Sequence, residues 1–247
     1  MQDELERMCK RMEELARRAE ARGCWVYSDF LSLGEQQALQ RLRLDAPWQL
    51  AGGFEGAERC IVCFGSEALC YDAFDPPIAC LAVEPANARF AEPLGHRDVL
   101  GALMSLGLER TVLGDVLVKE TQAWFFCCER VADTLCRELR QVRCTTVRCV
   151  RGEAPSFVLE PPEATELAAA SERLDAVAAA VWQLSRAEAR ALVTAGQVFV
   201  NGLAAQKADA PLQVGELVSV RGKGRFRYEG PVRQTRSGRL RVSVRIY

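Results

Sequence analysis

The sequence lacks several features that would place it in common classes of protein. Its 247 residues contain no run of about 18 uncharged apolar residues, so we expect no membrane-spanning segment. Only one histidine is present, and no cysteine follows Cys149. The first six residues are acidic and polar, which is unlike a secretory signal peptide. These absences lead us to expect a protein of the cytoplasm.

The cysteines do not predict a metal site. There are 11, all before residue 150 and at irregular spacings, and free cysteine in a reducing compartment behaves as a small buried apolar residue. Cys60 and Cys63 have the spacing of half a zinc site, but they lack a partner pair and lie in a strand-like run, where residues three apart point to opposite faces. We expect them, like the adjacent Cys127 and Cys128, to fill the core, and we predict no metal and no cofactor.

Acidic residues are scarce in the C-terminal part of the chain. Residues 173–247 hold 13 Lys and Arg against 5 Asp and Glu, a local charge of about +8. The first 172 residues hold 19 against 28, about −9, so the net charge of −1 conceals two parts of opposite sign. A basic domain is typical of nucleic-acid binders, because each neutralised phosphate releases condensed counterions. A basic surface that contacts only solvent is the alternative.

Hydrophobic periodicity predicts a small mixed α+β domain over residues 1–72. Apolar residues at spacings of three and four indicate a helix over 3–22, which Gly23 ends. The pattern further predicts a short helix over 34–44 and strands over 48–51 and 57–64.

After Pro76 and Pro77 the pattern changes to a second domain, over residues 73–152. Its predicted elements are a strand over 78–83, a helix over 96–106, strands over 112–118 and 123–128, a helix over 129–142 and a strand over 145–150. The order β-α-β-β-α-β is that of a ferredoxin-like sandwich. RNA-recognition modules use this architecture, as do many unrelated proteins, so the order alone assigns no function.

Residues 153–172 contain three prolines and indicate a linker, in which a helix over 163–170 is one interpretation. The basic domain over 173–247 begins with a helix. Ser185 and Glu188 then form the signature of a capping box, which starts a second helix that ends at Gly196. Asn201 and Gly202, after a strand over 198–200, are the strongest short signal for a hairpin turn.

This segment resembles the S4 RNA-binding domain. The resemblance rests on Arg173-Leu174-Asp175, Leu184-Ser185-Arg186, Ala189, Leu192-Val193, Gly196, Val198, Val200-Asn201-Gly202, Leu212 and Gly215-Glu216. In that family the second helix and the turn before it face RNA. The resemblance therefore implies RNA contacts by Arg173, Ser185, Arg186 and Arg190, with Lys207 in the basic position near the following loop.

Two further basic segments follow. The first places Arg221, Lys223, Arg225 and Arg227 among glycines and aromatic residues, and two roles stay open for the rings of Phe226 and Tyr228: stacking on bases or closing the core. The second alternates Arg239, Arg241 and Arg245 with apolar residues. We favour a surface that follows phosphates over an edge strand whose charge blocks aggregation.

The rest of the chain resembles the YlmH-like S4-domain proteins, a bacterial family with cyanobacterial and plastid relatives. The matching residues are Asp29-Phe30-Leu31, residues 52–59, His96-Arg97-Asp98 with the helix to Gly107, Arg110 and Gly114-Asp115. Gly34 departs from the pattern, where a proline is expected. The resemblance implies an α+β protein of three domains that binds rRNA, tRNA or both on the large ribosomal subunit carrying obstructed peptidyl-tRNA, in ribosome-associated quality control.

His96, Arg97 and Asp98 could be misread as a catalytic trio. A kinase-type loop needs a downstream Asn, a glycine loop and Asp-Phe-Gly, and a nucleophile relay needs an activated Ser or Cys; neither context is present. His96 and Arg97 at a helix start suit a phosphate, and His96 acting as a cap is the alternative. We therefore predict no catalytic residues and no small-molecule substrate. The alternatives are an RNA-modifying enzyme that docks through the S4 domain, and a cell-division or photosystem-assembly factor with a protein partner.

Overall fold

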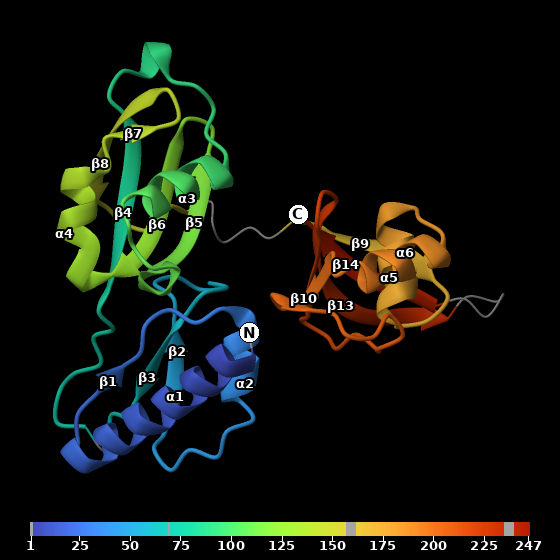
Figure 1. Cartoon of the computed structure of the whole chain (residues 1–247), viewed down its shortest axis with the longest axis horizontal. Helices are drawn as coiled ribbons and strands as arrows, with labels where there is room; N and C mark the ends of the chain where they lie inside the picture. Colours follow the sequence, from blue (N-terminus) through green and yellow to red (C-terminus); the bar gives the residue numbers. More distant parts are fainter. Residues whose placement is uncertain (1, 69, 157–161, 235–239) are drawn as a thin grey trace. The chain divides into compact units, whose positions relative to one another are not determined.

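The computed structural model describes residues 2–68, 70–156, 162–234 and 240–247 (Figure 1). The chain divides into two compact units, residues 1–159 and 160–247, which are described separately. Together they make an α+β protein with three sheets, as the sequence predicts. No helix within the described residues is both long and apolar enough to cross a bilayer.

The N-terminal part of the first unit packs helices on a three-stranded sheet. Its elements are α1 (Gln2–Arg22), β1 (Val26–Tyr27), α2 (Leu33–Leu39), β2 (Trp48–Ala51) and β3 (Ile61–Phe64), and the sheet order is β1-β3-β2. The apolar stripe of α1 is buried in a cluster with Val62 and Phe64 of β3. Ser32 and Glu35 form a capping box at the start of α2.

The second part of this unit is the ferredoxin-like domain that the sequence predicts. Its main elements are β4 (Ile78–Pro85), α3 (His96–Ser105), β5 (Leu113–Lys119), β6 (Gln122–Cys128), α4 (Glu129–Glu138), β7 (Gln141–Val142) and β8 (Thr145–Arg151), with short 3₁₀ turns η1 (Ala88–Phe90) and η2 (Arg110–Val112). The antiparallel order β5-β6-β4-β8-β7 places the first and third long strands at the centre. The helix α4 ends before the predicted residue 142, because β7 pairs with β8 there.

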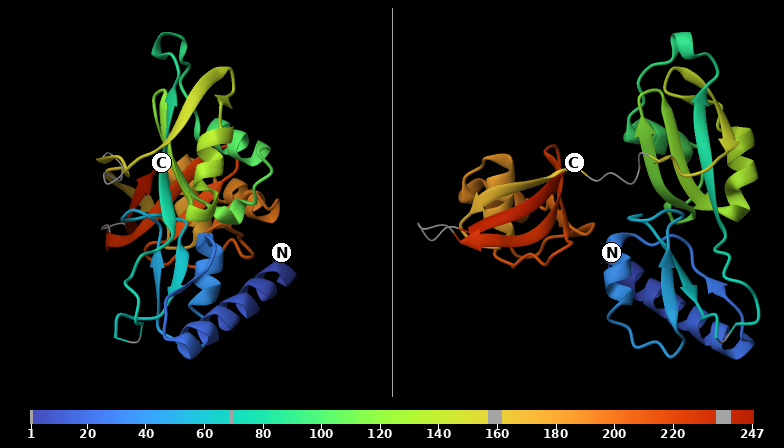
Figure 2. Two further views of the ribbon diagram at one scale, coloured as in Figure 1. Left: turned by 90° about the vertical axis from the view of Figure 1, so that its left-hand side faces the viewer. Right: turned by 180° about the vertical axis from the view of Figure 1, so that it is seen from behind.

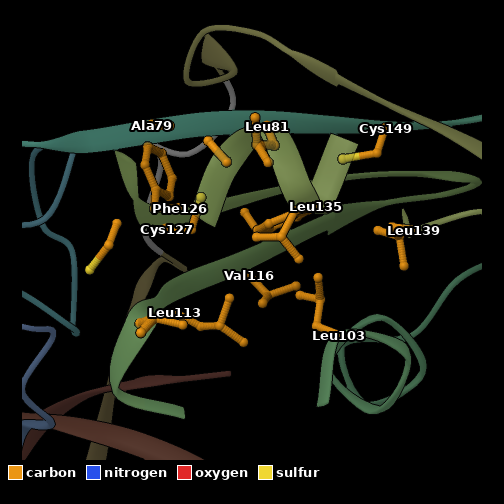
Figure 3. Packing of buried hydrophobic residues seen from close by; sticks show 14 of the residues in the cluster. Ala79, Leu81, Leu103, Leu113, Val116, Phe126, Cys127, Leu135, Leu139 and Cys149 are labelled. Carbon is orange, nitrogen blue, oxygen red and sulfur yellow. The ribbon is translucent and has the colours of Figure 1, made fainter. Parts of the chain in front are cut away.

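One hydrophobic core lies between this sheet and its two helices. Leu103 from α3 and Leu135 from α4 are fully buried against Leu81, Leu113 and other strand residues (Figure 3). Cys127 and Cys149 lie in the same cluster, while Cys60, Cys63 and Cys128 are also buried, which confirms that these thiols fill the core. Burial raises the pKa of the Cys63 thiol to about 12, so this thiol stays protonated at neutral pH.

The two parts of the first unit are joined by Arg59 and Asp115. The Arg59 guanidinium donates to the carbonyl oxygens of Leu113 (2.9 Å), Phe30 (3.1 Å) and Arg110 (3.2 Å). The Asp115 carboxylate accepts the backbone N–H groups of Glu58 (2.6 Å) and Arg59 (3.2 Å). The N-terminal part and the ferredoxin-like domain are thus joined by a polar contact built on these two side chains, and the Arg130–Asp29 ion pair at 2.7 Å adds another.

The second unit contains β9 (Ala164–Ala169), α5 (Leu174–Trp182), α6 (Arg186–Thr194), β10 (Val198–Val200), β11 (Leu203–Ala204), β12 (Leu217–Val220), β13 (Gly224–Gln234) and β14 (Leu240–Ile246). The sheet order is β11-β10-β12-β13-β14-β9. The helix suggested for 163–170 is wrong: β9 pairs with β14 over six residues, so part of the expected linker belongs to this sheet. Ladder hydrogen bonds and burial of Ala169 outweigh the helical propensity of Ala, Glu and Leu there.

Candidate nucleic-acid interface

A tight turn sets the second helix of the basic domain against the first. Gln183 adopts the left-handed conformation (φ 52°) at the end of α5, and the Leu184 N–H donates to the Ala179 carbonyl. The Ser185 hydroxyl then accepts the Glu188 N–H at 3.2 Å, while the Glu188 carboxylate accepts the Ser185 N–H at 2.8 Å. The capping box predicted from the sequence is therefore present and defines the first turn of α6.

Asp175 lies in the first turn of α5, and its side chain is fully buried. Three arginines donate to its carboxylate: Arg190 through Nε at 2.8 Å, Arg186 through Nη2 at 2.9 Å and Arg173 through Nη2 at 3.2 Å. Burial alone would raise the pKa of Asp175, but the hydrogen bonds from the three guanidiniums hold that pKa below its ordinary value. The carboxylate is therefore ionised at neutral pH.

The Asp175 cluster, meaning Asp175 with Arg173, Arg186 and Arg190, presents positive charge to solvent. The arginine side chains remain 34%, 43% and 54% exposed for Arg173, Arg186 and Arg190, while the aspartate is shielded. Three positive charges surround one negative charge, so the cluster carries a net charge of +2. Because each guanidinium is hydrogen-bonded to Asp175, the directions of its remaining N–H groups are constrained.

The sequence missed the part played by Asp175. It places Arg186 and Arg190 on one helix face, four residues apart, but their common acceptor comes from the preceding helix, 11 and 15 residues earlier. Asp175 itself could have revealed this role, because it is a charged residue between Leu174 and Ala176, which belong to the buried apolar side of α5. A buried carboxylate requires charged or hydrogen-bonding partners.

The other predicted residues near this surface have distinct surroundings. The Ser185 hydroxyl accepts the Glu188 N–H in the cap, and its contact with RNA stays a prediction. Lys207 is exposed in the loop after β11. Lys223 lies on the helix side of the domain, since its carbonyl accepts the Trp182 indole N–H at 2.9 Å. The pKa of Glu188 is lowered mainly by its hydrogen bonds with Ser185, and the charge of Lys223 lowers it further.

The aromatic residues of the basic tail close the core. Phe226 and Tyr228 are fully buried, the Phe226 ring meets the Trp182 ring edge-on at 5.4 Å, and the Tyr228 hydroxyl donates to Glu172 at 2.8 Å. Base stacking by these two rings, one of the two interpretations of the sequence, is therefore wrong. Because successive side chains of β13 point to opposite faces of the sheet, Arg225 and Arg227 lie on the face opposite to Phe226 and Tyr228.

The structure brings the arginines of the tail together on that face. Arg227 of β13 lies directly opposite Arg245 of β14, and Arg241 of β14 follows on the same face. Arg221 stacks over the ring of Phe199, and Arg225 over the ring of Tyr247, both at 5.0 Å. Arg239, also predicted to bind RNA, lies outside the described residues.

His96 and Arg97 belong to the first unit and begin helix α3. Both are exposed. The cap is Gly95 and not His96, because the Asp98 carboxylate accepts the Gly95 N–H at 2.9 Å. The structure therefore removes the capping role suggested for His96, and its contact with RNA stays a prediction.

Comparisons with known proteins agree with this description. Residues 78–154 match the family model "Putative RNA-binding domain in YlmH", and residues 172–218 match the S4 domain model. A ferredoxin-like domain and an S4 domain with a cationic helix face together define an RNA-binding protein. More particularly, the chain carries the two matched domains of the YlmH-like S4-domain proteins and is similar to that family over most of its length.

Two individual proteins are similar to this chain. "Ribosome-associated protein quality control protein P2" of Bacillus subtilis is 27% identical over 224 residues, which cover 87% of this chain and 85% of that protein. The solved structure "Cell division protein ylmH from Streptococcus pneumoniae" aligns with a TM-score of 0.50 at 16% identity, covering 63% of this chain and 94% of that one. The second likeness concerns the fold alone.

Proposed function

We propose that this protein binds structured rRNA or tRNA on the large ribosomal subunit holding obstructed peptidyl-tRNA, as a non-catalytic factor of ribosome-associated quality control in the cytoplasm. The observation that carries the proposal is the Asp175 cluster. Its three arginines are partly exposed and held in place by one buried carboxylate, and Arg186 and Arg190 lie on the helix that the S4 family directs toward RNA. Such preorganised guanidiniums suit the phosphates of a folded RNA.

The place of action rests on similarity. The Bacillus subtilis relative carries ribosome association and quality control in its name, and the similarity extends over both units of this chain. Both matched family models describe RNA-binding domains. The large subunit and the peptidyl-tRNA come from the family resemblance and are the finer parts of the proposal.

Sedimentation of a native lysate through a sucrose gradient tests the proposal. We expect the protein to migrate with free large subunits, and brief RNase treatment to move it to the top of the gradient. A protein that stays at the top in both gradients would contradict the ribosomal role. Migration in a large complex that resists RNase would indicate a protein partner instead.

Arg190→Gln tests the cluster itself. Arg190 uses only Nε on Asp175, and its side chain is 54% exposed, so Arg173 and Arg186 still neutralise Asp175 in this variant. We expect weaker binding to large subunits and a fall of about 1 in the slope of log affinity against log salt. The matched control is Arg18→Gln on the exposed face of α1, which removes the same charge from the first unit. Equal binding by both variants would show that α6 does not face RNA.

A further inference from the structure

The C-terminal sheet has two faces of different chemistry. On one face Val218, Phe226 and Val244 pack under the helices, in a cluster with Leu174 and Val177 of α5 and Val193 of α6. Figure 1 and Figure 2 show α5 and α6 together on that side of the sheet. The other face, here called the arginine face, has no described helix against it.

The arginine face is strongly basic. Its charged residues within the described part of the chain are Arg221, Arg225, Arg227, Arg233, Arg241, Arg245, Glu166 and Glu229. Six arginines against two glutamates give a net charge of +4. The Asp175 cluster lies on the helix side of the same sheet, so one small domain carries two separate cationic surfaces, on opposite sides.

The cross-strand pairing increases the charge density of the arginine face. Arg227 lies opposite Arg245, and Arg233 lies opposite Arg241, although like charges directly opposite one another destabilise a sheet. Glu229 pairs with Arg245 at 3.1 Å and Glu166 with Arg233 at 3.7 Å, which compensates one arginine of each pair. An anion on this face would relieve the repulsion that remains.

The geometry of individual side chains also suits a polyanion. The Nε of Arg227 is buried and has no hydrogen-bond partner among the described residues. The guanidiniums of Arg221 and Arg225 lie 5.0 Å from the ring centroids of Phe199 and Tyr247, and these cation–π contacts restrict their movement. Rows of arginines on neighbouring strands place charges at repeated intervals, as the phosphates of a nucleic-acid backbone require.

We propose that the arginine face is a second binding surface for an RNA backbone, so that one domain holds two RNA segments at once, one on each side of its sheet. The proposal rests on the proposed RNA-binding function but uses different residues. All the strand residues after 218 lie outside both matched family models. The ligand is RNA rather than an acidic protein because the proposed function already assigns the helix side of the same domain to RNA.

The test uses the full chain and a short RNA hairpin of about ten base pairs, prepared with a donor dye and separately with an acceptor dye. Wild-type protein should bind two hairpins per chain and bring donor and acceptor together, giving energy transfer. Mass photometry should show that the transferring species contains one protein chain. Binding of a single hairpin with no energy transfer would overturn the proposal.

The variant R225Q/R241Q assigns the second surface. It should leave one hairpin bound, abolish the energy transfer and lower the salt slope of total binding by about 2. The matched control is R7Q/R18Q, which removes two exposed charges from α1 and should behave as wild type. Energy transfer that persists in R225Q/R241Q would place the second hairpin elsewhere and refute the proposal. If wild-type protein binds no hairpin at all, the RNA-binding function itself is refuted.

Discussion

The Arg59–Asp115 contact of the first unit and the Asp175 cluster of the second unit use arginine charge in different ways. In the first unit Arg59 and Asp115 join the N-terminal part to the ferredoxin-like domain, and the Arg59 guanidinium donates hydrogen bonds to three backbone carbonyls. In the second unit three arginines meet Asp175, and each remains at least 34% exposed. The Arg59 guanidinium is thus used within the fold, whereas the arginines of the Asp175 cluster leave positive charge exposed to solvent.

The titration of the two aspartates reflects this difference. Burial raises the pKa of Asp115, although the N–H groups of Glu58 and Arg59 oppose the rise. Burial likewise lowers the pKa of Arg110, beside this cluster, to about 10. Hydrogen bonds from Arg190, Arg186 and Arg173 lower the pKa of Asp175 against its own burial. The number of cations per carboxylate, rather than burial alone, decides the sign.

Arg59→Met should give the largest effect on stability. It leaves three carbonyl oxygens without their donor, while Asp115 keeps its two backbone N–H donors, and we expect the free energy of unfolding to fall by about 3 kcal/mol. Urea unfolding measures the change, with Arg18→Met as the control, expected within about 0.5 kcal/mol of wild type. RNA affinity of the folded variant should be unchanged. An unaltered unfolding midpoint would show that contacts other than those of Arg59 hold the two parts of this unit together.

Asp175→Asn should lower the stability of the second unit by about 2 kcal/mol at neutral pH, because three arginines lose their charged acceptor while partial exposure lets water replace it. Since the folded pKa of Asp175 is depressed, its contribution is complete above the unfolded pKa of about 4 and is lost as pH falls through the folded pKa. The stability difference between wild type and D175N should therefore shrink below about pH 4. A difference that is independent of pH would contradict the ion-pair description.

Asp115→Asn tests the difference between the two aspartates, because the folded pKa of Asp115 is raised whereas that of Asp175 is lowered. As pH falls through that folded pKa toward about 4, protonation of Asp115 should stabilise wild-type protein relative to D115N. The two variants should thus show pH dependences of opposite sign. Thermal unfolding between neutral pH and pH 3 measures both curves, and slopes of the same sign would remove the distinction between the clusters.

Ser185→Ala should give the smallest effect. Loss of one side-chain acceptor at the start of α6 costs about 1 kcal/mol of stability. RNA affinity measured well below the melting temperature should stay at the wild-type value, because the hydroxyl serves the cap. Ser105→Ala at the end of α3 serves as a control for removal of an exposed helical hydroxyl. A marked loss of RNA affinity in S185A, with the fold intact, would instead indicate a direct contact of Ser185 with RNA.

Most helices, strands and turns could be predicted from local sequence patterns. The capping box of Ser185 and Glu188 and the turn at Asn201 and Gly202 depend on neighbours a few residues away, and the structure contains both. The β-α-β-β-α-β order gave the ferredoxin-like sheet for the same reason. The helix suggested for 163–170 failed because its partner strand lies about 75 residues downstream, where no local pattern refers to it.

The sequence by itself determined the class of protein: a charged C-terminal part, an S4-type pair of helices and a ferredoxin-like order of elements. Only the tertiary structure decided how the arginines are used. Convergence of three guanidiniums on Asp175, and division of the tail between a buried aromatic face and an arginine face, follow from helix packing and strand register. Both depend on contacts between residues distant in the chain, whereas sequence patterns record only the periodicity of single elements.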